Sequence, residues 1–144
     1  MIEINNLTAL QINEKILKKI VGKVLIGENK KKASLSIAFI GEKRMKSLNK
    51  KYRNKNKATD VLAFSGDSLP VNLNIKNRSL GEIVICFQEI KKNAKKFKTD
   101  FKKELKRILI HGVLHLLGYD HEKGDLETKK MKKKEEYYFT KINN

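Results

Sequence analysis

The sequence has few of the features that mark secreted or membrane proteins. A single cysteine, Cys86, stands in 144 residues, so no disulfide can form within the chain. No apolar run approaches the roughly 18 residues that a membrane-spanning helix needs, and the first residues lack a basic segment followed by an apolar one. Hydrophobic residues still make up 40% of the chain, which excludes a disordered polycation. We therefore expect a cytoplasmic protein without a membrane anchor that folds around its own core.

Acidic residues are also scarce. The chain has 33 Lys and Arg against 16 Asp and Glu, a formal net charge of +17. A field of that sign attracts polyanions such as nucleic acids. Coding bias toward A and T offers another explanation because it replaces arginine by lysine, but it does not explain why basic residues are twice as numerous as acids. The charge therefore favours a polyanionic partner.

Helix-like and strand-like segments alternate along the chain without a repeat or a linker. Asn13 is the expected N-cap of the first helix. Residues 66–79, which include Pro70, are expected to form a loop with an extended piece around 71–75. The pattern predicts one α+β domain over 1–144, with a small mixed sheet flanked by helices. Apolar periodicity predicts helices over 13–26, 42–54, 88–98, 100–117 and 125–140, and strands over 33–40, 59–64 and 81–87.

All three histidines lie within eleven residues at the end of the longest predicted helix. His111 and His115 are four residues apart, so on a helix their side chains lie on one face, one turn apart. Gly118 can adopt a positive φ and end the helix, which lets the chain bring His121 back toward the other two. Three imidazoles leave one position open on a tetrahedral zinc ion, which is typical of catalytic zinc sites.

The full spacing is more specific than a histidine pair. It matches the metzincin ligand frame H-E-x-x-H-x-x-G-x-x-H in each ligand and in the glycine. The alternative is a histidine cluster without metal, but buried unpaired imidazoles are costly. Metzincins carry their general base after the first histidine, where this chain has Gly112. We therefore predict one Zn²⁺ per chain on His111, His115 and His121, in a zincin-like site that does not hydrolyse peptides by the usual route.

Three blocks of the sequence resemble the YbeY family of bacterial single-domain endoribonucleases, and together they extend over most of the chain. They are residues 49–53 with 59–64, residues 80–85, and residues 111–121. The resemblance implies a zinc-dependent hydrolase of phosphodiester bonds that acts in ribosomal RNA maturation, at the 3′ end of the small-subunit RNA, and in ribosome quality control. It implies ribosomal RNA or the ribosome as partner, ribosomal proteins or a GTPase as candidate protein partners, and no DNA specificity.

Arg53 is one of four arginines in a lysine-rich chain, so it raises the question why lysine would not serve there. A planar guanidinium that binds two phosphate oxygens is one answer, and a salt bridge to a surface acid is the alternative. The resemblance implies that Arg53 is functionally essential and lies in the same cleft as the metal. We therefore predict that Arg53 binds substrate phosphate and acts in catalysis as an electrostatic clamp.

Two acidic residues are weaker candidates for supporting the ligands. Asp60 opens a predicted strand, where it either supports a ligand imidazole or Arg53, or serves as a turn or capping residue. Asp120 precedes the last ligand, and we expect it to shape the turn rather than act as a base. Two rival functions stay open: a ribosome assembly or RNA-binding factor with a structural zinc, and a metzincin-like amide hydrolase.

Overall fold

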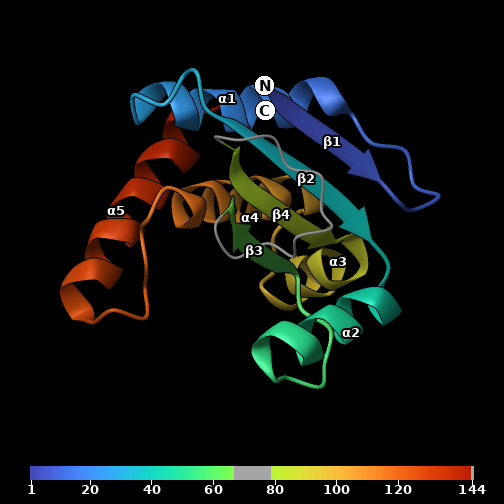
Figure 1. Ribbon diagram of the computed structural model, residues 1–144. Helices are drawn as coiled ribbons and strands as arrows, with labels where there is room; N and C mark the ends of the chain where they lie inside the picture. The colour runs from blue at the N-terminus through green and yellow to red at the C-terminus, as the bar shows by residue number, and fades with distance from the viewer. Residues whose placement is uncertain (67–78, 144) are drawn as a thin grey trace.

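The computed structural model describes residues 1–66 and 79–143, and in them a four-stranded sheet carries helices on both faces (Figure 1). The strand order is β1-β2-β4-β3. The first three strands in that order are parallel, whereas β3 pairs antiparallel with β4 along the edge. A mixed sheet of this kind confirms the α+β class. The strands are β1 (Ile2–Asn6), β2 (Ser34–Ile40), β3 (Val61–Ser65) and β4 (Ser79–Cys86).

Each helix expected from the apolar periodicity is present. They are α1 (Glu14–Gly27), α2 (Glu42–Arg53), α3 (Phe87–Lys96), α4 (Phe101–Leu116) and α5 (Asp125–Lys141). The predicted cap of α1 is confirmed, because the Asn13 side chain accepts a hydrogen bond from the N–H of Ile16 at 3.3 Å. Strand β1 was not predicted, and the extended piece expected at 71–75 lies outside the described residues.

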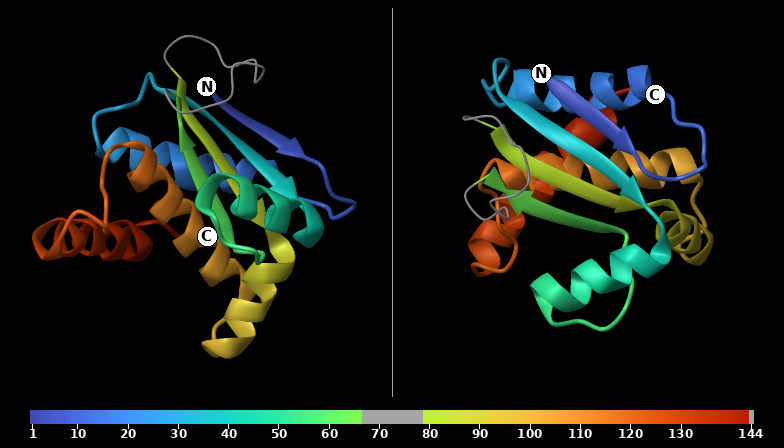
Figure 2. Two further views of the ribbon diagram at one scale, coloured as in Figure 1. Left: turned by 60° about the horizontal axis from the view of Figure 1, so that its bottom comes forward. Right: turned by 45° about the vertical axis from the view of Figure 1, so that its right-hand side comes forward.

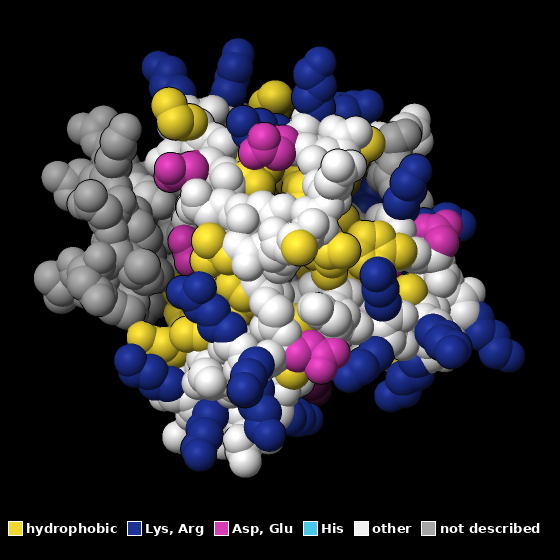
Figure 3. All heavy atoms as spheres, turned by 90° about the vertical axis from the view of Figure 1, so that its right-hand side faces the viewer, with side chains coloured by type: hydrophobic (Ala, Val, Ile, Leu, Met, Phe, Trp, Pro, Cys, Tyr) yellow, Lys and Arg dark blue, Asp and Glu magenta, His cyan; other side chains and the backbone are white. Residues whose placement is uncertain are grey.

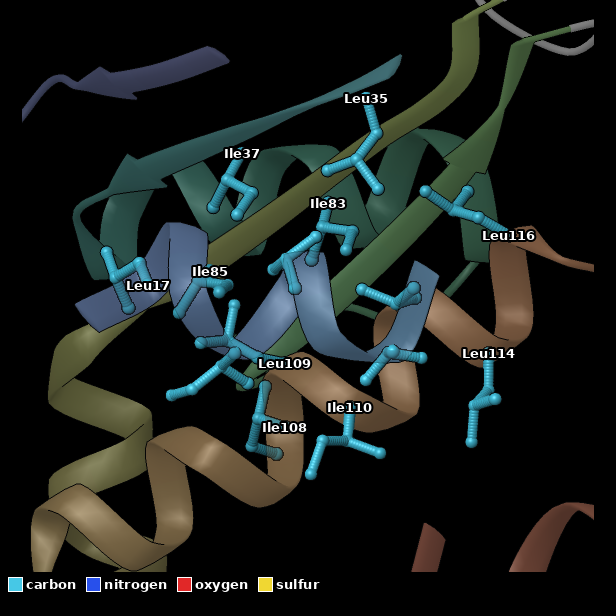
Figure 4. Packing of buried hydrophobic residues seen from close by; sticks show 14 of the residues in the cluster. Leu17, Leu35, Ile37, Ile83, Ile85, Ile108, Leu109, Ile110, Leu114 and Leu116 are labelled. Carbon is cyan, nitrogen blue, oxygen red and sulfur yellow. The ribbon is translucent and has the colours of Figure 1, made fainter. Parts of the chain in front are cut away.

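The core lies mainly on one face of the sheet, under α1 and α4. Strand alternation explains the division, since Ile83 and Ile85 of β4 point to that face while Val84 and Cys86 point to the face covered by α2. Burial raises the pKa of the Cys86 thiol, in keeping with a core position. Figure 4 shows the main cluster, with Leu17, Leu35, Ile37, Ile83, Ile85, Ile108, Leu109, Ile110, Leu114 and Leu116 labelled.

Helix α4 connects the core to the candidate site. Its hydrophobic side packs on α1, β3 and β4, and its last turn leads toward α5, which lies beside it beyond the edge of the sheet (Figure 2). Within 1–66 and 79–143, no helix combines the length and the apolar character needed to cross a membrane. His111 and His115 therefore lie in the last turns of a helix whose other side is buried in the core, and His121 follows in the turn after it.

Candidate metal centre

The end of α4 turns the chain back on itself. Gly118 has φ of +105°, a conformation that strains residues with a Cβ atom, so the positive φ expected from the sequence is confirmed. The N–H of Gly118 donates to the carbonyl of His115, and the N–H of Tyr119 donates to that of Leu114, both at 3.1 Å. This pair of bonds is a Schellman cap, which closes the helix and reverses the chain toward His121.

The reversal brings the three histidines together, as the sequence predicted. The ring centroids of His111 and His121 are 5.5 Å apart, and those of His115 lie 6.5 Å from His111 and 6.4 Å from His121. Asp120 lies beside two of them: one potential ligand atom from each of His115, Asp120 and His121 lies within 4.8 Å of the others, and His111 is not a member of this closer group. His121 is exposed and the other members are half-buried, so the cluster is open to solvent on one side.

The ring nitrogens indicate what the cluster can hold. Nδ1 of His111 lies 2.9 Å from Oε1 of Glu135, and because a carboxylate accepts, this nitrogen donates. In the neutral imidazole Nε2 then keeps a free lone pair. Nδ1 of His115 is buried and has no hydrogen-bond partner within the described part of the chain. A water molecule or an ion is one explanation for a buried nitrogen without a partner. Imidazole and carboxylate donors are those that zinc takes, so the residues fit a metal ion.

The electrostatic environment keeps His115 in the form that a metal requires. Burial lowers its pKa below the ordinary value of 6.5, and the positive character of His111, His121 and Arg53 lowers it further, whereas Asp120 acts in the opposite direction. A neutral imidazole presents a lone pair for coordination.

Arg53 is the last residue of α2, and its exposed side chain lies along β3. Its Nη2 donates to the carbonyl of Ala63 at 3.0 Å, its Nη1 to that of Tyr52 at 3.3 Å, and the guanidinium carbon lies 5.4 Å from the ring centroid of Phe64. In the residues that the structure describes, no carboxylate forms a salt bridge with Arg53. A guanidinium has more N–H donors than these two bonds use, so it can also bind an anion.

The two acidic candidates have different environments. The carboxylate of Asp60 accepts hydrogen bonds from Asn93 at 3.0 Å and from Thr59 at 3.3 Å, and neither Arg53 nor a histidine is among its hydrogen-bond partners in the described residues. Asp120 accepts a hydrogen bond from the N–H of Glu122 at 2.8 Å, which shapes the turn, and also lies within the cluster.

Sequence reasoning missed Glu135, which lies in a lysine-rich helix well beyond the last histidine. The spacing of residues along α5 could have identified it. Met131 and Tyr138 are both buried and define the inner face of α5, and Glu135 lies on that same face between them. Charge alone could not distinguish it from its neighbour Glu136, which is exposed.

Comparison with known proteins extends over nearly the whole chain. The profile of the family described as Endoribonuclease YbeY matches residues 2–143. A protein of that name from Petrotoga mobilis is 40% identical over 140 residues, which is 96% of this chain and 92% of that protein. One from Thermodesulfovibrio yellowstonii is 42% identical over 71% of this chain and 62% of its own length. A solution structure from Thermotoga maritima matches with a TM-score of 0.66 and 32% identity, covering 96% of this chain and 87% of that one.

Proposed function

The chain belongs to the Endoribonuclease YbeY family, and we propose that it is a zinc-dependent endoribonuclease of ribosomal RNA maturation in the cytoplasm. Membership places it among endoribonucleases, which are hydrolases that cut RNA internally. The observation that carries the zinc proposal is the open cluster of three histidines, in which the buried Nδ1 of His115 has no hydrogen-bond partner in the described residues. We further propose that residues 1–144 form one catalytic domain, which acts at the 3′ end of small-subunit RNA and in ribosome quality control.

The proposed ligands are His111, His115 and His121. A bound zinc ion would supply Lewis acidity and lower the pKa of a water molecule toward about 7. In this arrangement Asp120 keeps its bond to the N–H of Glu122 and holds the turn that carries His121. The exposed side of the cluster is where the phosphodiester would approach.

Arg53 is the proposed electrostatic clamp. Two backbone carbonyls and the Phe64 ring hold its guanidinium in place, so its remaining N–H groups are oriented before substrate arrives. A planar guanidinium can donate to two oxygens of one phosphate group at once. Arg53 would therefore bind the non-bridging oxygens and stabilise the negative charge that develops on them as the P–O bond breaks.

The surface charge would support binding of a polyanion. Figure 3 shows one face on which Lys and Arg side chains are spread widely, with few Asp and Glu side chains between them. Such a field raises the rate of encounter with RNA and supplies affinity that does not depend on base sequence. Ribosomal RNA is the proposed substrate, and ribosomal proteins or a GTPase are the proposed protein partners.

A cleavage assay on two nucleic acids tests this function. RNA that spans the 3′ end of small-subunit ribosomal RNA and a DNA of the same sequence are incubated separately with the metal-containing protein. We expect the RNA to be cut at defined positions and the DNA to remain intact. If the RNA is bound but never cut, the chain is a ribosome assembly factor, and if neither nucleic acid is bound, the RNA proposal is wrong.

A further inference from the structure

Helix α5 contacts two of the three histidines. Glu135 accepts a hydrogen bond from Nδ1 of His111 at 2.9 Å, and the hydroxyl of Thr128 donates to the backbone carbonyl of His121 at 2.7 Å. We propose that α5 positions the cluster, with Glu135 fixing the ring of His111 and Thr128 fixing the backbone that carries His121. This inference rests on the proposed function, since the metal centre is what the two contacts would serve.

The Glu135 contact determines how His111 presents its ring. A carboxylate on Nδ1 requires a proton on that nitrogen, so in the neutral imidazole the Nε2 lone pair is free and the ring is held at one angle. Without Glu135 the proton could occupy either nitrogen and the ring could rotate. Carboxylates that orient ligand histidines in this way strengthen metal binding. The side chains of Glu135 and His111 are 25% and 32% exposed, so solvent only partly competes for the hydrogen bond between them.

Helix α5 is itself anchored on both sides of Glu135. Met131 is buried in the main core. The hydroxyl of Tyr138 and the ammonium of Lys134 both donate to the carboxylate of Glu28 at the end of α1, the latter at 3.1 Å. Because these anchors lie within about one turn of Glu135, the carboxylate is held against His111 rather than left on a free helix.

His111 links two events, the binding of metal by the cluster and the docking of α5. The bond to Glu135 favours the ring form that binds metal, and by reciprocity a metal on His111 favours the docked α5. His121 adds a second link, because Thr128 lies in the first turns of α5 and contacts the segment that carries this histidine. Docking of α5 and occupation of the cluster are therefore coupled.

Zinc affinity tests the role of Glu135. The full chain and the variants Glu135→Ala, Glu135→Gln and Glu136→Ala are titrated with zinc in competition with a chromophoric chelator. We expect Glu135→Ala to bind zinc about 10–100-fold more weakly and Glu135→Gln to lose less, because its amide oxygen still accepts. Glu136 is exposed, so its variant should match the wild type. Unchanged affinity in Glu135→Ala would overturn the proposal.

A matched pair of threonine variants tests the second contact. The hydroxyl of Thr128 lies 2.7 Å from the carbonyl of His121 and 2.8 Å from that of Gly124, whereas the hydroxyl of Thr140 bonds only carbonyls of its own helix in the described structure. Thr128→Val should weaken zinc binding several-fold, and Thr140→Val should leave it unchanged. Equal affinities in the two variants would remove Thr128 from the positioning role.

A measurement without metal separates this inference from the proposed function. In metal-free protein, ¹⁵N NMR of the imidazoles should show His111 with its proton on Nδ1, and Glu135→Ala should show a mixture of tautomers. Circular dichroism identifies variants that have not folded, and if Glu135→Ala is one of them, Glu135→Met replaces it because methionine has a similar length and no carboxylate to accept the bond. If the wild type binds no zinc, the proposed metal function is wrong, and the tautomer of His111 still shows whether Glu135 positions its ring. An unchanged His111 tautomer in Glu135→Ala would contradict the proposed positioning by Glu135.

Discussion

Gly112 of α4 lies so close to Ile83 of β4 that a Cβ atom built on the glycine would be 3.1 Å from the isoleucine side chain. The position after His111 therefore faces the sheet and not the histidine cluster. Metzincins have their general base at this position, and a glutamate there would be forced into the core of this protein. Gly112 thus permits close packing of α4 on β4 and argues against amide hydrolysis by the metzincin route.

Replacement of this glycine should cost stability. Alanine in a helix interior normally stabilises by about 0.5–1 kcal/mol relative to glycine. At Gly112 the added methyl group would overpack against Ile83, at a cost of about 1–3 kcal/mol, so we expect Gly112→Ala to lower the free energy of unfolding by about 1 kcal/mol. Urea denaturation of the metal-free protein measures this change.

Gly22 in α1 is the matched control, because a Cβ atom there would have nothing within 4 Å. Gly22→Ala should raise the free energy of unfolding by about 0.5–1 kcal/mol. Equal stabilisation by both substitutions would show that α4 does not pack on β4 as closely as described.

Much of this fold could be predicted because its helices bury one face and repeat their apolar residues at helical spacing. The histidine cluster was also predictable, since His111 and His115 lie one helical turn apart and Gly118 marks the reversal before His121. Strand β1 (Ile2–Asn6) escaped prediction because five residues give too short an alternation, and its pairing with β2 is a long-range contact.

The partners of the site could not be predicted, because tertiary packing alone selects them. Glu135 is one of several charged residues on α5, and only the docking of that helix on α4 places it against His111. Tyr119 is similar. It follows Gly118 in the turn, and its hydroxyl donates to Glu28, which lies far away in the sequence.

The carboxylate of Glu28 should make stability depend on acid pH. Burial raises the pKa of Glu28, but hydrogen bonds from Tyr119, Tyr138 and Lys134 outweigh burial and hold it below the ordinary value of 4.5. Because the pKa is lower in the folded state than in the unfolded state, the carboxylate stabilises the fold above pH 4.5, and this contribution is lost as pH falls through the folded-state pKa.

The variant Glu28→Gln should be less stable at neutral pH and less sensitive to acid. We expect its free energy of unfolding at neutral pH to be about 1–3 kcal/mol lower than that of the wild type, with a smaller further loss on acidification. Urea denaturation at neutral pH and below pH 4.5 gives both quantities. Glu136→Gln, at an exposed position, should keep the wild-type response. An identical acid response in Glu28→Gln and the wild type would show that Glu28 is not its source.

Binding of RNA should depend steeply on salt. If lysine–phosphate contacts supply the affinity, the logarithm of the association constant falls linearly with the logarithm of salt concentration as counterions are released. Lys132→Ala, on the exposed side of α5, should weaken binding slightly and reduce the slope by about one contact or less. Fluorescence anisotropy between low and physiological salt measures both. A flat response would mean that the net charge reflects coding bias and not a binding surface.

Arg53→Lys should separate binding from chemistry. The variant keeps the positive charge and most RNA affinity, but an ammonium cannot reproduce the two-pronged contact of the guanidinium. We expect the rate at saturating protein to fall about 100-fold or more, the effect of losing one transition-state donor. Single-turnover cleavage isolates this step from binding, and Lys132→Ala should leave the saturated rate unchanged. Wild-type cleavage by Arg53→Lys would make Arg53 a docking residue only.

A zinc titration of metal-stripped protein decides whether the histidine cluster is the catalytic metal centre. Bound zinc and the single-turnover rate of RNA cleavage are measured on the same samples, for the wild type and for His115→Ala. We predict that the wild-type rate rises from near zero in proportion to bound zinc and saturates at about one ion per chain, while His115→Ala neither binds zinc tightly nor cleaves. Cleavage at the full rate by stripped protein or by His115→Ala would show that the histidine cluster is not the catalytic centre.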